Sequence, residues 1–153
     1  MFSLIISIIS IALVAALAAA TVYFGGAAFN KGSAGADAST FINGAQQVAG
    51  AFTLASADNN LAPTSTVADL QSGLGTPVQI YLSQVPTYKG TKLALDGTAK
   101  DYIKLPVSDQ VCAEINNRAA PGVALDVDME GLYGCIVDAT DAPKVWTAFY
   151  KVK

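Results

Sequence analysis

The sequence predicts an α+β protein in which a long hydrophobic N-terminal helix packs on a C-terminal antiparallel β-sheet. Three observations predict it. Residues 1–24 carry no charge and are almost all apolar or small. Apolar residues then recur at three- and four-residue spacing over residues 37–56, which is typical of an amphipathic helix. From about residue 78 apolar residues alternate with polar ones, as they do in half-buried strands, and such a sheet needs an apolar helix face as its cover.

The N-terminal segment is long enough to span a membrane. At 1.5 Å per residue its helix would measure about 36 Å, against a hydrocarbon core of about 30 Å. A signal peptide would begin with basic residues, and a plain anchor would have a cation on its flank; the first charged residue is instead Lys31. A third interpretation is that a basic leader has been removed and that Met1 is the mature amino terminus. This interpretation accounts for the missing charge, and we favour it.

Small and hydroxyl side chains mark faces of this helix. Ser3, Ser7 and Ser10 fall on one side by their spacing. Small residues would let neighbouring helices approach closely in an apolar medium. They are Ala12, Ala16, Ala19 and Ala20. Alternatively, the serines bond the carbonyls of their own helix and the alanines have no special role.

A glycine-rich stretch follows over residues 25–35. Each of its four glycines weakens a helix by nearly 1 kcal/mol relative to alanine, so we expect the helix to bend, unwind or stop there. The helical pattern resumes at Asp37 and ends near Ser56. Its apolar face consists of Phe41, Ile42, Ala45, Val48, Ala49, Phe52 and Ala55.

The remaining elements are predicted from caps, turns and periodicity. Thr66 and Asp69 form a capping box for a short helix, Val67–Leu74, with Gly75 as its stop. Ser108 caps a second helix, Asp109–Ala119. Alternation predicts the strands Val78–Leu82, Lys92–Leu95, Tyr102–Leu105, Val123–Met129, Leu132–Val137 and Val145–Val152, with prolines after the first and third.

Composition excludes several classes of function. The net charge is −3 and no basic run occurs, so nucleic acid is not expected as the primary ligand. The chain has no histidine, which removes the commonest general base and transition-metal ligand. No combination of serine, cysteine and carboxylate forms a plausible active site. We therefore expect no enzyme activity, no cofactor and no metal.

The two cysteines, Cys112 and Cys135, indicate a disulfide. A domain exported behind a membrane helix lies in an oxidising compartment, where cysteine pairs form disulfides. Closing a loop of this size stabilises a fold by about 3 kcal/mol in the chain-entropy model. Two free buried thiols are the alternative.

One stretch imitates a calcium site. Residues 126–131 read Asp-Val-Asp-Met-Glu-Gly, like the start of an EF-hand loop. The twelfth position is Val137 where a bidentate glutamate is required. We interpret these carboxylates as the solvated face of a strand.

This order of parts resembles a mature type IV pilin, and the type IVb branch in particular. The likeness rests on the start Met-Phe-Ser-Leu-Ile-Ile-Ser, a helical spine over residues 1–56 and a cysteine pair near the C-terminus. The resemblance implies that residues 1–24 form the membrane or filament core, with a flexible break at 25–35. Residues 57–153 would form the globular head, in which the disulfide brackets residues 112–135.

The resemblance also implies a course of assembly. In that family a prepilin peptidase removes a leader and the new terminal amine is methylated, which here falls on Met1. The helix lies first in the inner membrane, and the assembly machinery then packs it among copies of itself in the core of an extracellular filament. The implied packing residues are Phe2, Ser3, Leu4, Ile5, Ile6, Ser7, Ile9, Ser10, Leu13 and Leu17.

Two positions depart from the family's pattern. The fifth mature residue is usually a glutamate that pairs with a neighbour's terminal amine, and here it is Ile5. The helix-breaking proline of the type IVa branch is absent, and we expect Gly25 and Gly26 to supply the flexible point in its place.

The expected function is therefore that of a structural subunit that polymerises with itself into an extracellular filament. Ile5 suggests one alternative, a minor pilin or a pseudopilin of a secretion or pilus machine. The other is a single-span exported binding protein that never polymerises. Adhesion, motility, DNA transfer and secretion are all compatible roles for the filament.

Overall fold

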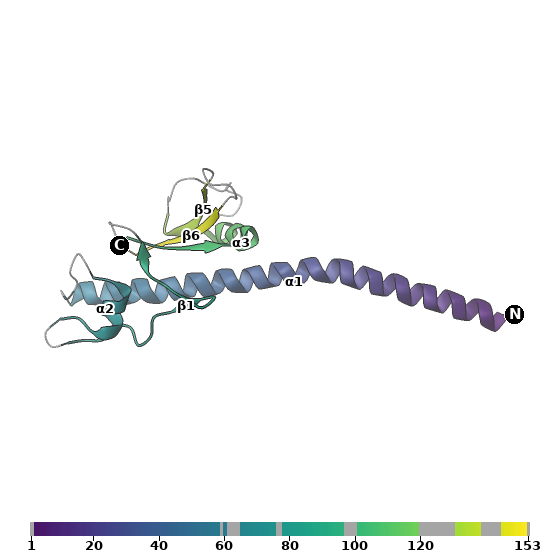
Figure 1. Ribbon diagram of the computed structural model, residues 1–153, viewed down its shortest axis with the longest axis horizontal. Helices are drawn as coiled ribbons and strands as arrows, with labels where there is room; N and C mark the ends of the chain where they lie inside the picture. The colour runs from purple at the N-terminus through teal and green to yellow at the C-terminus, as the bar shows by residue number, and fades with distance from the viewer. Residues whose placement is uncertain are drawn as a thin grey trace. The chain divides into compact units, whose positions relative to one another are not determined.

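The computed structural model describes residues 2–58, 60, 65–75, 78–96, 101–119, 131–138 and 145–152. It confirms an α+β fold with a long N-terminal helix and antiparallel sheets (Figure 1). The chain consists of two compact units, Met1–Ala34 and Gly35–Lys153. The elements are α1 (Phe2–Ala57), α2 (Val67–Ser72), β1 (Thr87–Tyr88), β2 (Thr91–Lys92), β3 (Leu95–Asp96), β4 (Tyr102–Val107), α3 (Asp109–Ala119), β5 (Tyr133–Asp138) and β6 (Val145–Lys151).

Helix α1 is continuous over 56 residues. The expectation that it unwinds or stops within residues 25–35 is therefore wrong. Helix formation is cooperative, and the stretch contains alanines and no proline, so four glycines weaken the helix without ending it. Flexibility at Gly25 and Gly26 stays a prediction.

The second part of α1 carries the predicted apolar face. Phe41, Ala45, Val48 and Ala55 have no exposed surface. Ile42 and Phe52 are also buried, and Ala49 is half-buried. The spacing of these residues thus identified the face that the Gly35–Lys153 unit covers.

Helix α2 begins as predicted and ends earlier. The Thr66 hydroxyl accepts from the Asp69 N–H, and the Asp69 carboxylate accepts from the Thr66 N–H at 2.6 Å, which completes the capping box. The helix stops at Gly73, whose φ of +108° favours glycine, and not at Gly75.

The strand predicted at Val78–Leu82 is wrong. Among the described residues, its one ladder contact is an isolated antiparallel bridge between Leu74 and Gln79. The N–H groups of Tyr81 and Leu82 both donate to the Leu70 carbonyl, each at 3.0 Å. Because these donors satisfy the end of α2, they cannot extend a strand ladder.

A hairpin made of β1 and β2 packs on α1. Lys89 and Gly90, both at positive φ, form its two-residue turn. The Tyr88 ring meets Phe41 edge-on, with 6.1 Å between ring centroids. The strand predicted at Lys92–Leu95 is divided between β2 and β3, which belong to different sheets.

The main sheet has four antiparallel strands in the order β3-β4-β6-β5. Leu105 pairs with Ala148, which also pairs with Cys135, so these buried side chains share one face. Strand β4 continues through Pro106, against the expectation that this proline ends it. The proline is tolerated because β3 pairs only with the first residues of β4, so β6 is its sole described strand neighbour.

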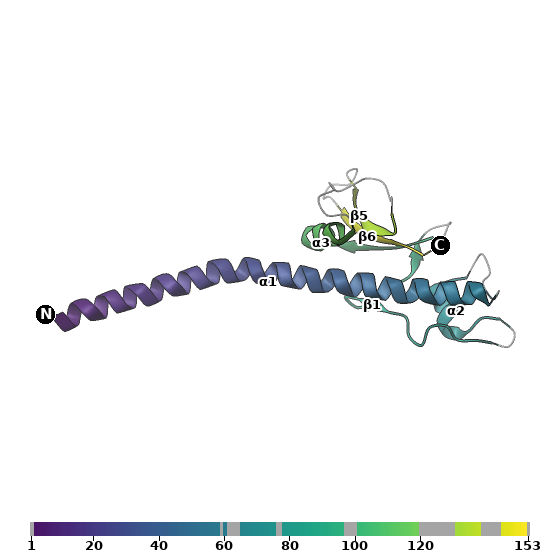
Figure 2. The same cartoon turned by 180° about the vertical axis from the view of Figure 1, so that it is seen from behind.

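Strands β5 and β6 confirm the predicted C-terminal strands within a residue or so. The strand expected at Val123–Met129 lies outside the described residues. Helix α3 has the predicted bounds, and the Ser108 hydroxyl accepts from the Val111 N–H at 3.4 Å as its cap. Figure 2 shows α3 beside β5 and β6, which it contacts.

Candidate functional site

The candidate site is the apolar surface of α1 within the Met1–Ala34 unit. The large hydrophobic side chains of this stretch are exposed, from 53% at Ile5 to 84% at Phe2. An isolated helix with apolar residues on every side is unstable in water and needs lipid or protein around it. The exposed set is Phe2, Leu4, Ile5, Ile6, Ile8, Ile9, Ile11, Leu13, Val14, Leu17, Val22, Tyr23, Phe24 and Phe29.

By length and composition, α1 is the one helix of the described chain that could cross a membrane. The core helix of a soluble protein or a signal sequence can meet the same criterion. None of the most hydrophobic 18-residue window is buried, so this segment does not act as a core helix within its own chain. It is a candidate membrane span or a surface that packs with other molecules.

All the predicted packing residues, Phe2 to Leu17, lie on this exposed segment. Ile5 is a fully apolar position, and no carboxylate occurs in the described part of this unit. Met1 lies outside the described residues, so processing and methylation there stay a prediction. Contact between copies also stays a prediction, because the structure contains one chain.

The serine face is internally bonded. The Ser7 hydroxyl donates to the Ser3 carbonyl at 3.0 Å, and the Ser10 hydroxyl donates to the Ile6 carbonyl at 2.9 Å. Thr21 bonds the Ala18 carbonyl in the same way. These hydroxyls therefore offer acceptor lone pairs and little donor capacity to neighbours, which suits an apolar surrounding. The back-bonding interpretation is confirmed for Ser7 and Ser10.

The glycines of the predicted flexible point face open space. A Cβ at Gly25, Gly26 or Gly32 would meet no heavy atom within 4 Å apart from its chain neighbours and the backbone of its own helix. Nothing in the described chain therefore requires glycine at these positions. Their absent side chains can matter only for the helix's own flexibility or for close approach by another molecule.

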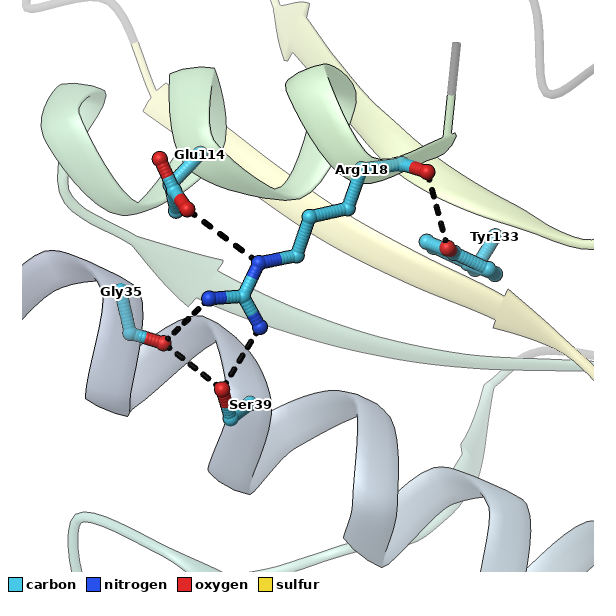
Figure 3. Close-up of polar contacts among 5 residues, drawn as sticks. All are labelled: Gly35, Ser39, Glu114, Arg118 and Tyr133. Carbon is cyan, nitrogen blue, oxygen red and sulfur yellow. Dashed lines mark hydrogen bonds and ion pairs between the residues drawn. The ribbon is translucent and has the colours of Figure 1, made fainter. Parts of the chain in front are cut away.

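Arg118 on α3 joins the head to α1, a role that the sequence analysis missed. Its Nη1 donates to the Ser39 hydroxyl at 2.6 Å, and its Nη2 donates to the Gly35 carbonyl at 3.0 Å (Figure 3). Nε bonds Glu114 one turn earlier at 3.2 Å, which fixes the guanidinium plane. The i, i+4 pair was visible in the sequence, but its distant partners were not.

The predicted disulfide between Cys112 and Cys135 is present, with Cα atoms 5.4 Å apart. Asn116, one turn further along α3, donates to the Cys135 carbonyl at 3.1 Å and accepts from its N–H at 2.7 Å. These bonds lie on the side of β5 away from β6, and β5 is the last strand of the sheet among the described residues. Asn116 thus blocks strand addition at the position that the disulfide covers.

Three side chains of the Gly35–Lys153 unit have raised pKa values, two because of burial and one because of an ion pair. Burial raises the pKa of the Tyr150 hydroxyl, and the neighbouring Tyr133, stacked at 6.0 Å, adds to the effect. Burial also raises the pKa of Tyr88, whose hydroxyl has no hydrogen-bond partner in the described chain. A 2.7 Å bond to Asp37 raises the pKa of Lys89. None of these groups forms a catalytic arrangement with another.

No metal-binding group was found in the part of the chain that the structure describes, counting clusters of three or more histidine, cysteine or carboxylate side chains. The carboxylates of the EF-hand-like stretch, Asp126, Asp128 and Glu130, lie outside the described residues. The interpretation of that stretch as a strand face therefore stays a prediction.

No protein-family model, curated protein or solved structure matches this chain. The likeness to pilins accordingly rests on architecture. A long apolar N-terminal helix, a small antiparallel sheet and a disulfide are present, which is loosely pilin-like.

Proposed function

We propose that this protein is the structural subunit of an extracellular, type IV pilus-like filament. The N-terminal part of α1 packs with copies of itself in a dry core, and the Gly35–Lys153 unit forms the outer coat. One observation carries the proposal: a helix with an exposed apolar surface precedes a unit that has its own core and disulfide. Packing such helices together removes their apolar surface from water, which contributes a favourable free energy of about 25 cal/mol per Å² buried.

Before assembly the same helix would lie in the inner membrane. Its apolar length suits a bilayer, and the back-bonded hydroxyls of Ser7, Ser10 and Thr21 leave few polar groups for lipid to meet. The membrane form and the filament form then differ only in what surrounds the helix. Prepilin peptidase and a pilus assembly machine are the partners that this route requires.

Two leucines on α1 provide a matched test. Leu13 and Leu54 are both 60% exposed, but only Leu13 belongs to the proposed core. We expect Leu13→Asp to abolish filaments, because an unpaired carboxylate in a dry core is strongly disfavoured. Leu54→Asp should leave filaments intact. Electron microscopy of the sheared extracellular fraction measures both, and the amount of each variant in the membrane fraction controls for insertion.

The wild-type result also separates the alternatives. Long filaments containing this chain as their main component support the proposal. Small amounts of the chain in filaments made of another subunit would indicate a minor pilin or pseudopilin, as the absence of a carboxylate at Ile5 suggests. A chain that stays monomeric in detergent, in cells without filaments, would indicate a single-span binding protein.

A further inference from the structure

A small polar hollow lies between α1 and the segment that precedes the β1–β2 hairpin. It has a volume of about 340 Å³ and is lined by Gln47 and by residues 82–87. Both walls belong to the Gly35–Lys153 unit. The volume is near the lower end of the range for small-molecule pockets, which is about 300–1,000 Å³. A ligand of this hollow must therefore be small.

The walls of the hollow are held in place on both sides. The Leu82 N–H donates to the Leu70 carbonyl, and the Pro86 carbonyl accepts from the Leu93 N–H, each at 3.0 Å. Pro86 also packs closely against Gly44 of α1, where a Cβ on the glycine would lie only 3.2 Å from the proline. The exposed Ser83 and Gln84 lie between these anchors. The hollow is thus preformed, which lowers the entropic cost of binding.

The polar side chains that line the hollow are available for hydrogen bonds to a ligand. Gln47, Ser83, Gln84 and Thr87 form no side-chain hydrogen bond with any described residue, and all four are exposed. Carboxamides and hydroxyls both donate and accept hydrogen bonds. Leu82 and Val85, which are both buried, also line the hollow, and we refer to these apolar residues as its apolar floor.

None of the described residues that line the hollow is charged. Phosphate and carboxylate ligands are bound by arginine, lysine or clustered N–H donors, and cations by carboxylates. The nearest cation along the chain, Lys89, is already paired with Asp37 at 2.7 Å. An anion or a metal ion would therefore lose its hydration here without gaining a charge partner.

We propose that this hollow binds a small uncharged saccharide. Vicinal sugar hydroxyls match carboxamides that donate and accept side by side, and the C–H face of a sugar ring matches the apolar floor. A peptide is a poorer match, because residues 83 and 84 form a bend and offer no strand ladder for an extended chain. The proposal is independent of whether the protein forms filaments.

The test uses the full-length protein in a detergent that has no sugar headgroup. Glucose, galactose, mannose and N-acetylglucosamine are titrated separately, and binding is followed by calorimetry and by NMR. We expect at least one of them to bind with a millimolar dissociation constant. Gln47→Ala and Gln84→Ala should each weaken that binding about fivefold, as the loss of one hydrogen bond worth about 1 kcal/mol predicts.

Gln46 provides the matched control. It precedes Gln47 on α1 and is equally exposed, but it does not line the hollow. Gln46→Ala should bind the sugar as the wild type does, and unchanged circular dichroism would show that all variants fold. The proposal is overturned if none of the four sugars binds, or if Gln46→Ala weakens binding as much as Gln47→Ala. Tighter binding of galacturonate or of a neutral tripeptide would overturn it as well.

Discussion

Arg118 is the residue with the most far-reaching contacts in the head. Its guanidinium reaches Ser39 and Gly35 on α1, and its own carbonyl accepts from the Tyr133 hydroxyl on β5 at 3.2 Å. One side chain and its backbone thus connect α1, α3 and the sheet. Charge-assisted bonds of this kind are stronger than neutral ones, although the side chain is 36% exposed and solvent screens part of the effect.

We predict that Arg118→Ala lowers the free energy of unfolding by about 1–2 kcal/mol, because the Gly35 and Ser39 oxygens lose a charged donor. Arg118→Lys should recover only part of this loss, since an ammonium lacks the planar fork that reaches both oxygens. Urea unfolding measures the change. Asp96→Asn, which breaks the exposed Lys104–Asp96 pair, should change stability by under about 0.5 kcal/mol. Equal effects of the two substitutions would contradict the prediction.

Tyr150 makes the head sensitive to alkali. Burial raises the pKa of its hydroxyl in the folded state, so the folded protein favours the neutral form. The resulting stabilisation is complete below the ordinary tyrosine pKa of about 10 and is lost as the pH rises through the raised value. We predict that the urea midpoint falls as the pH rises above about 10.

Tyr150→Phe should fall less over that range, since it has no proton to lose at this position. Tyr88 and Lys89, whose pKa values are also raised, lose their contributions in the same direction and account for the remaining decrease. A variant whose midpoint falls as steeply as that of the wild type would show that Tyr150 does not control the alkaline transition.

Among the elements, α1 contains two glycines whose presence no contact in the described chain explains. Gly25 and Gly26 weaken the helix, yet no described neighbour approaches them. We predict that replacing both with alanine raises the stability of the helix in detergent by about 1–2 kcal/mol. Because the predicted flexible point is then lost, filament yield should fall. Circular dichroism during heating and electron microscopy measure the two effects.

Gly50 provides the control for this pair. It also lies on α1, and a Cβ there would meet no heavy atom within 4 Å beyond its chain neighbours and its own helix backbone, but it is outside the glycine-rich stretch. Gly50→Ala should stabilise the helix and leave filament yield unchanged. Normal yield in the Gly25, Gly26 double variant would remove the flexible point from the mechanism.

The sequence predicted several elements that local chemistry decides. Ser108 and Thr66 identified the starts of α3 and α2, and the apolar spacing identified the buried face of α1. It failed where a distant partner decides. Tyr81 and Leu82 alternate like a strand, but their N–H groups bond Leu70.

The same division holds for the candidate site. Hydropathy located the exposed apolar segment, because that property belongs to consecutive residues. The bonds from Arg118 to Ser39 and Gly35 cross about 80 residues of sequence and have no local signal. The two hydrogen bonds between Asn116 and Cys135 join residues 19 apart in the sequence and have no local signal either. Pro106 is a third case. A proline lacks an N–H, so it ends a strand only where a neighbouring strand needs that hydrogen-bond donor.

In the whole chain, the two compact units differ in how far their side chains are buried or bonded within the described residues. The Gly35–Lys153 unit contains nearly all of the buried residues, the disulfide and the described ion pairs. The Met1–Ala34 unit is a helix with exposed apolar side chains. The exposed apolar surface of the described chain is therefore concentrated in the first unit.

We predict that a chain beginning at Gly35 is soluble without detergent, monomeric and cooperatively folded. It keeps the buried face of α1 from Phe41 to Ala55, and it keeps the Asp37, Ser39 and Gly35 partners of Lys89 and Arg118. Its loss is confined to the exposed apolar helix, so its core should stay intact. Analytical ultracentrifugation and thermal unfolding under oxidising conditions measure this, and the same truncation should abolish filaments. A shortened chain that aggregates or melts without cooperativity would contradict the prediction. It would show that the Gly35–Lys153 unit depends on the Met1–Ala34 unit for its fold.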